Sequence, residues 1–233
     1  KDKQAQEELL RSLMNVRMPK PVSEEFLKIQ DEYLTQRNIE RKITNVDDLQ
    51  PVASDSRLYI WKGDITTLKC DAIVNACNSQ MLGCFSPMHA CIDNFIHTYA
   101  GIELRLKMYE IMQKQGHEEE TGKAKITSGY NLPAKYILHT VGPIIQWHVT
   151  PKDEKLLASC YRECLKLAAD TGAESVAFCC LSTGVFRFPQ QRAAEIATET
   201  VKSYIKEDSR IKKVVFNVFK NEDLEIYQRI LSK

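Results

Sequence analysis

The feature that most constrains the fold of this chain is the alternation of strand and helix patterns from Ser56 onward. Short runs rich in β-branched and aromatic residues recur at residues 58–61, 72–74, 125–128, 136–141, 176–180 and 214–219. Between the later runs, apolar residues repeat at helical spacing, once around Leu157 and Cys160 and once around Ala193 and Ala197. Alternation of this kind predicts a layered α/β sheet with helices on both faces.

The first 55 residues follow a different pattern. Residues 4–14 place leucines on one face of an expected helix, and a second helix is expected over residues 23–41 with Ser23 as its N-cap. The inward face of the second helix is predicted to carry Phe26, Ile29 and Tyr33. Two amphipathic helices cannot make a core alone, so we expect residues 1–55 to be an N-terminal helical extension packed on a domain that spans residues 56–233.

Composition excludes several classes of function. Lys and Arg number 32 against 31 Asp and Glu, so a net charge of +1 argues against electrostatic capture of nucleic acid or an anionic membrane. No apolar run approaches the length of about 18 residues that a membrane span needs, and the N-terminus is charged rather than signal-like. The eight cysteines do not form a disulfide-scaffold pattern, which favours a reducing compartment. The expectation is a soluble, cytoplasmic globular protein.

Cys84, His89 and Cys91 fall within eight residues of one another. Two thiolates and an imidazole are ligands that zinc prefers, and three protein ligands leave one open position on a tetrahedral ion. Cysteine is also a common small core residue, and a fourth ligand from elsewhere would make the site closed and structural. The residues alone therefore leave a catalytic metal site, a structural metal site and a buried-cysteine cluster open.

Polar residues follow the ends of several expected strands, which is where α/β sheets bind ligands. Asn75 and Asn78 follow the run at 72–74, and Asp64 follows the run at 58–61. Residues 182–184 form a Ser-Thr-Gly turn that enters a helix, and backbone N–H groups at such a turn suit a phosphate, although the Lys of a Walker loop is absent. Each of these features taken alone is better explained by turn or helix-capping chemistry.

Taken together and in order, these segments resemble the macrodomain family over roughly residues 56–233. The resemblance rests on residues 63–66, 71–79, 92–93 with 96–97, 121–122, 139–143 and 182–186. The segment with Cys84, His89 and Cys91 resembles the zinc-containing branch of macrodomain ADP-ribosyl hydrolases, which is mainly microbial and includes bacterial proteins. The resemblance implies a three-layer α/β/α sandwich with a mixed central sheet. Two departures are that residues 85–88 and the metal ligands replace the family's glycine run, and that Cys77 replaces a small apolar residue.

The resemblance also implies roles for individual residues. Asp64 would accept from the adenine amino group with Ile65 beside the ring, and Asn78 and Asp93 would form the catalytic polar pair near the distal ribose. The diphosphate would be wrapped by Ser182, Thr183, Gly184 and Val185, with Phe186 against the distal ribose. Phe219 would stack on adenine, although a place in the core of a strand is an equal alternative. Asn75 would hold the loop that follows the run at 72–74. His97 and His139 would belong to the core or lie behind the site.

The implied function is a zinc-dependent hydrolase, with one Zn²⁺ per chain held by Cys84, His89 and Cys91. Its substrate would be a mono-ADP-ribosylated protein, with ADP-ribose joined by an ester to a carboxylate side chain. Three alternatives remain: a reader that binds ADP-ribose without cleavage, an O-acetyl-ADP-ribose deacetylase, and an interaction module with a structural zinc. Neither nucleic acid nor a membrane is an expected partner.

Overall fold

The structure is a computed structural model of the chain that describes residues 2–232. A seven-stranded mixed sheet lies at its centre, with the strand order β2-β3-β9-β8-β5-β7-β6. In that order the strands span Pro51–Val52, Asp55–Lys62, Lys213–Val218, Ser175–Phe178, Ala72–Cys77, Tyr136–Val141 and Ala124–Ser128. The five inner strands are parallel to one another, and the edge strands β2 and β6 are antiparallel to them. A separate parallel pair joins β1 (Thr44–Asn45) to β4 (Leu68–Lys69).

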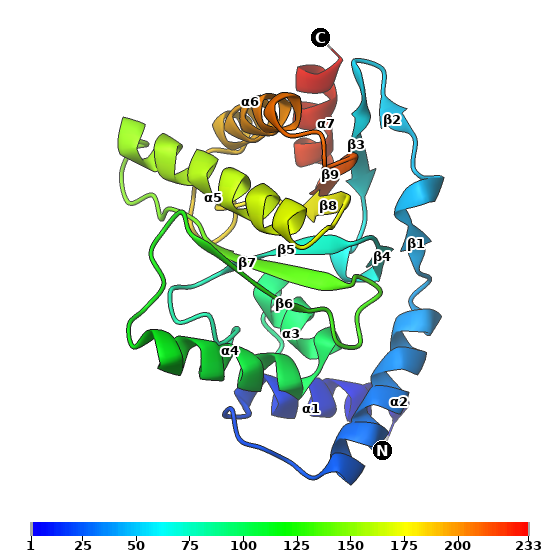
Figure 1. Cartoon of the computed structure of the whole chain (residues 1–233). Coiled ribbons are helices and arrows are strands. Elements are labelled where there is room, and N and C mark those ends of the chain that lie inside the picture. The colour runs from blue at the N-terminus through cyan, green and yellow to red at the C-terminus, as the bar shows by residue number, and fades with distance from the viewer. Residues whose placement is uncertain (1, 233) are drawn as a thin grey trace.

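Helices cover both faces of the sheet and confirm the predicted three-layer sandwich. One face carries α3 (Ile92–Ala100) and α4 (Ile102–Gln115), and the other carries α5 (Pro151–Asp170), α6 (Gln190–Glu207) and α7 (Asn221–Leu231) (Figure 1). Sequence patterns predicted α5 and α6 but not α3, α4 or α7. Among residues 2–232, no helix has the length and apolar character that a membrane crossing requires.

The central strands are buried on both faces, which explains why they read as continuous apolar runs rather than as alternating patterns. In β5, Ile73 and Val74 are fully buried, and in β8 so are Val176 and Ala177. The α5 helix that packs beside them begins with a capping box in which Thr150 accepts from the Asp153 backbone and donates to its carboxylate. The few buried polar residues within these strands, such as Asn75 in β5 and His139 in β7, therefore need hydrogen-bond partners inside the protein.

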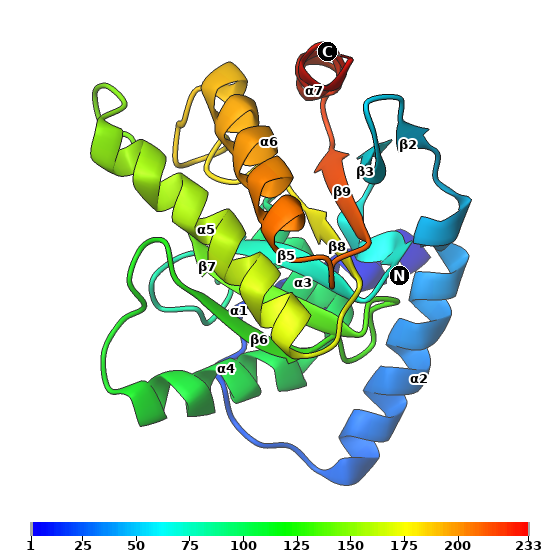
Figure 2. The same ribbon diagram turned by 45° about the horizontal axis from the view of Figure 1, so that its top comes forward.

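The N-terminal residues form α1 (Lys3–Val16) and α2 (Glu24–Glu40), and Ser23 caps α2 as predicted. Figure 2 shows α2 running along one side of the molecule. The predicted inward face of α2 is wrong, because Phe26, Ile29 and Tyr33 are 46%, 61% and 36% exposed. The buried residues of α2 are Gln30, Leu34 and Asn38.

Hydrogen bonds to loop backbone explain why polar residues of α2 face inward. The Asn38 amide donates to the Asn131 carbonyl at 2.7 Å, and the Gln30 side chain accepts from the Ile102 N–H at 2.9 Å. Each bond satisfies a backbone group that would otherwise be costly to bury. The two helices are followed by η1 (Val46–Asp48) and by β2, which pairs with β3 at the sheet edge.

Candidate active site

The predicted site residues gather at one edge of the sheet. Because β3, β9, β8, β5 and β7 are parallel, their carboxyl ends share that edge. The loops that leave these ends carry Asp64, Phe219, Ser182, Asn78 and Gly142, in the order of the strands. Residues from five separate segments of the sequence are thus presented on the same side, as strand-end reasoning predicted.

Asp64 is held firmly at the end of β3. Its carboxylate accepts from the N–H of Thr66 at 3.0 Å and so caps the short helix η2 (Ile65–Thr67). The same carboxylate forms an ion pair with Arg41, whose guanidinium lies 3.4 Å from the ring centroid of Tyr99. Ile65 is 1% exposed as a whole residue and belongs to the core, so its place beside the adenine ring stays a prediction. The capping function of Asp64 is present, and its contact with adenine stays a prediction.

The loop after β8 has a strained and tightly bonded backbone. Ser182 has φ 63°, and its buried Oγ has no hydrogen-bond partner among residues 2–232. The loop closes on itself because the Phe188 N–H donates to the Ser182 carbonyl at 2.9 Å. It is also bonded to the loop after β7, because the Ile145 N–H donates to the Phe186 carbonyl at 2.8 Å. An unpartnered buried hydroxyl and a positive φ in one residue are features of functional loops.

Apolar side chains around the same edge face solvent. Phe219 is 75% exposed, Val185 70%, Ile144 60% and Trp147 90%. Phe219 lies one residue beyond β9, so the alternative that placed it in the core of a strand is wrong. Exposed aromatic and aliphatic groups beside polar loop ends are typical of a ligand-binding surface.

A buried polar chain lies behind the end of β5. Asn75 donates to the Oδ1 atom of Asp93 at 2.8 Å, and its amide nitrogen lies 3.2 Å from Nδ1 of His139. Burial raises the pKa of Asp93 to about 6, against the opposing effects of the Asn75 hydrogen bond and the charge of Arg105. Asn75 thus positions Asp93. Asn78, in contrast, is exposed, and its Oδ1 atom accepts from the Gln80 N–H at 3.0 Å in a turn.

The burial of His139 predicts that folding is sensitive to acid. Burial lowers its pKa from 6.5 to about 3, so below pH 6.5 the unfolded chain takes up a proton there that the folded protein does not. We expect this residue alone to lower the free energy of unfolding by about 2 kcal/mol between pH 7 and pH 5. His139→Gln should therefore lose less stability than the unmodified protein over that interval. Urea unfolding at both pH values, with a chelator present, measures this. An equal loss would contradict it, and His148→Gln, at an exposed histidine, is the control.

The three predicted metal ligands lie together between β5 and α3. One potential ligand atom from each of Cys84, His89 and Cys91 lies within 4.8 Å of the other two, and the Cys84 Sγ atom is 3.5 Å from the His89 Nδ1 atom. Ligand atoms on a tetrahedral zinc with Zn–S near 2.3 Å and Zn–N near 2.1 Å are about 3.5–3.8 Å apart. Both cysteines are half-buried, His89 is exposed, and burial raises the pKa of the Cys91 thiol. The trio therefore fits a zinc ion with an accessible side.

Gly83 lets the metal-bearing segment pass close to the buried polar chain. It has φ 80°, and a Cβ atom at this position would lie 2.7 Å from the ring of His97. Both its conformation and the contact thus require glycine. His97 is buried, and its Nε2 atom is 3.6 Å from the Asp93 Oδ1 atom. The segment with Cys84 therefore packs directly over the residues that surround Asp93.

Comparison with known proteins places this geometry in a family. The Macro domain family profile matches residues 74–197. A protein-ADP-ribose hydrolase from Treponema medium is 56% identical over 99% of this chain and 89% of its own length. One from Staphylococcus aureus strain MSSA476 is 54% identical over 97% of this chain and 85% of its own length. The chain belongs to the macrodomain family.

Solved macrodomains have the same fold. A Trypanosoma brucei macrodomain in complex with ADP-ribose has a TM-score of 0.74 and 28% identity, with 94% of each chain covered. An Oceanobacillus iheyensis macrodomain with ADP has a TM-score of 0.67 and 37% identity, over 78% of this chain and 92% of that one. The sequence resemblance to macrodomains is therefore confirmed.

Sequence analysis missed two arginines near this macrodomain's site. Arg41 pairs with Asp64 from the N-terminal extension, and no local pattern indicates that contact. Arg105 is 5% exposed on the buried face of α4 with Leu104, Met108 and Met112. A charged residue among apolar residues at helical spacing was a signal, because such a charge is buried only with partners.

Proposed function

We propose that this chain is a zinc-dependent protein-ADP-ribose hydrolase. The observation that supports it best is the position of the Cys84, His89 and Cys91 trio at the carboxyl edge of the sheet. The last of the three ligands precedes Asp93 by two residues. A reader of ADP-ribose needs a binding cleft but neither metal ligands nor a buried carboxyl beside them. The names of relatives at 56% and 54% identity, and the ADP-ribose bound by the Trypanosoma brucei macrodomain, support the same activity.

We assign the binding of ADP-ribose to the loops at the strand ends. Asp64 would hold adenine at the point where Ile65 begins η2, with Phe219 stacked on the base. The loop of Ser182, Thr183, Gly184 and Val185 would hold the diphosphate, and Phe186 would lie against the distal ribose. Asn78 has an exposed side chain whose Oδ1 atom is used in its turn, which leaves its NH₂ group for a ribose hydroxyl.

We assign the chemical step to Asp93 beside the metal ligands. Zinc, when bound by Cys84, His89 and Cys91, would supply polarisation of a substrate oxygen. Asp93, positioned by Asn75, would orient a water molecule and accept its proton, for which a pKa near 6 is better suited than that of an ordinary aspartate. A carboxylate leaving group needs no proton from an acid. One buried carboxyl that acts as a base is therefore enough for hydrolysis of an ester to a carboxylate side chain.

The activity can be tested with a protein carrying ester-linked mono-ADP-ribose. The intact zinc protein is expected to release ADP-ribose, a chelator to stop the release, and added zinc to restore it. Binding of free ADP-ribose without release from ester-linked, serine-linked or acetyl-linked substrates would favour the reader. Release that continues unchanged with all metal removed would contradict the role of zinc.

The adenine assignment predicts the effect of Asp64→Ala. We expect affinity for free ADP-ribose to fall by about 1–3 kcal/mol, because a charge-assisted hydrogen bond to the adenine amino group is lost. Calorimetric titration measures this. Asp64→Asn keeps an acceptor for the Thr66 N–H, so it separates the capping role from the charge. Unchanged affinity in both variants would leave Asp64 as a cap only.

A further inference from the structure

The N-terminal helix α1 contacts the segment that carries the metal ligands, residues 82–91, here called the metal loop. α1 lies outside residues 74–197, which the family profile matches. Arg11 donates from Nη2 to the carbonyl of His89 at 3.1 Å, and the Oδ1 atom of Asn15 accepts from the N–H of Met88 at 3.0 Å. Two side chains one helical turn apart thus hold adjacent residues of the loop.

These contacts flank a strained residue. Met88 has φ 57°, in the left-handed region that side chains other than glycine rarely adopt, and its side chain is 39% exposed. Burial therefore does not explain its conformation. Strained residues persist where surrounding groups fix them. Here Asn15 accepts from the N–H of Met88, and Arg11 donates to the carbonyl of the following residue, His89. The imidazole of His89 follows directly from this fixed point.

Asn15 is itself rigidly placed. It is 1% exposed, and its amide nitrogen donates to Thr98 Oγ1 in α3 at 3.1 Å, which orients its Oδ1 atom toward Met88. Arg11 also donates to Asn94 Oδ1 at 2.8 Å, and Asn94 donates to the Ser86 carbonyl of the loop at 2.9 Å. The metal loop is therefore bonded to α1 and α3 together.

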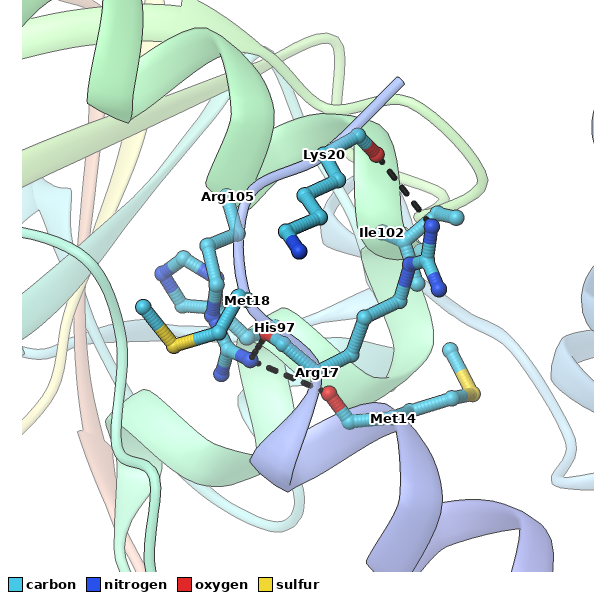
Figure 3. Close-up of a pocket in the computed structure, with 8 residues that line it drawn as sticks. Met14, Arg17, Met18, Lys20, His97, Ile102 and Arg105 are labelled. Carbon is cyan, nitrogen blue, oxygen red and sulfur yellow. Dashed lines mark hydrogen bonds between the residues drawn. The ribbon is translucent and has the colours of Figure 1, made fainter. Parts of the chain in front are cut away.

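Arg105 joins the end of α1 to the start of the metal loop. Its Nη1 atom donates to the carbonyls of Met14, Asn15 and Arg17, and Figure 3 shows its guanidinium beside the main chain at Met14 and Arg17. Its Nε atom donates to the Leu82 carbonyl at 2.7 Å. A buried cation at the carbonyl end of a helix is favourable, and here it fixes α1 against the residue two positions before Cys84.

We propose that α1 is a positioning element of the metal site, in which Asn15 and Arg11 hold the metal loop in the conformation that brings its three ligands together. The inference rests on the proposed zinc role of Cys84, His89 and Cys91. Metal affinity would then depend on α1, a helix that belongs neither to the sheet nor to the helices that cover its two faces. Groups that orient metal ligands typically change metal affinity by about 10–100-fold when they are removed.

The test is the zinc affinity of Asn15→Ala, measured on metal-stripped protein by competition with a chromogenic chelator. We expect zinc binding to weaken by about 10-fold or more. Asn15→Asp retains an acceptor for the Met88 N–H and should restore affinity to within about threefold. Glu7→Gln is the matched control, because it breaks the 2.9 Å ion pair between α1 and Arg37 without contacting the metal loop, and its zinc affinity should not change.

Two further variants separate positioning from general stability. In a Met88→Gly background the left-handed conformation is no longer strained, so Asn15→Ala should weaken zinc binding less than it does alone. Arg11→Gln, at a partly exposed position, should weaken zinc binding by roughly threefold or more. This variant provides the test if Asn15→Ala does not fold.

The outcomes that overturn the inference are distinct from those that overturn the proposed function. A folded Asn15→Ala and a folded Arg11→Gln that bind zinc as tightly as the unmodified protein would overturn the positioning role and leave the zinc site standing. An unmodified protein that binds no zinc would overturn the metal assignment and this inference with it. Thermal unfolding in excess chelator shows which variants are folded and how far each loses metal-free stability.

Discussion

Asp93→Asn is expected to lower the rate constant for release of ADP-ribose from an ester-linked substrate by about 100-fold or more, and to leave affinity for free ADP-ribose within about threefold. Asparagine fills the same volume and keeps an oxygen for the hydrogen bond from Asn75, so the surrounding chain should persist. What is lost is the group that would accept a proton from water. Single-turnover release, measured beside a calorimetric titration on the same protein, provides both quantities.

The matched control for this prediction is Asp71→Asn. Asp71 lies just before the amino end of β5, at the opposite end of the strand that positions Asp93, and accepts from Ser175 and Lys135. Its replacement is expected to reduce stability but to leave single-turnover release unchanged. Equal loss of release in both variants would show that the effect of Asp93→Asn comes from the fold. Full release by Asp93→Asn would show that another group performs the step.

The fold was largely predictable because its strongest signals are local. The strands β5, β7 and β9 are short apolar runs, and α5 and α6 repeat apolar residues at helical spacing. The shared edge of the site followed from the parallel order of the strands, which places their carboxyl ends together. The spacing of Cys84, His89 and Cys91 is also local, so the sequence could indicate the cluster that the structure contains.

What could not be predicted depends on contacts between distant segments. The pattern of α2 favoured Phe26 and Ile29 as inward residues, whereas Gln30 and Asn38 face inward because they bond to backbone near Ile102 and Asn131. Hydrophobic periodicity contains no information on which loop will need a hydrogen-bond partner. The contacts of α1 with the metal loop have the same origin, and they connect residues more than 70 positions apart.

The double variant Cys84→Ser, Cys91→Ser is expected to reduce bound zinc from about one ion per chain to almost none, because hydroxyls replace the two thiolates that zinc prefers. Elemental analysis of protein purified without added metal measures this. The zinc-bound protein should also unfold at a higher temperature than the double variant, since a ligand that binds only the folded state stabilises it. A chelator should therefore lower the unfolding temperature of the unmodified protein and leave that of the double variant unchanged.

Cys180→Ser is the matched control for the double variant. Cys180 is half-buried like Cys84 and Cys91, but its Sγ atom lies 3.7 Å from the Asn217 carbonyl and is outside the metal loop. This variant should retain its zinc. If the unmodified protein contains little zinc, and the double variant contains the same, Cys84 and Cys91 are half-buried core cysteines, and hydrolysis would then depend on Asp93 and the strand-end loops without a metal.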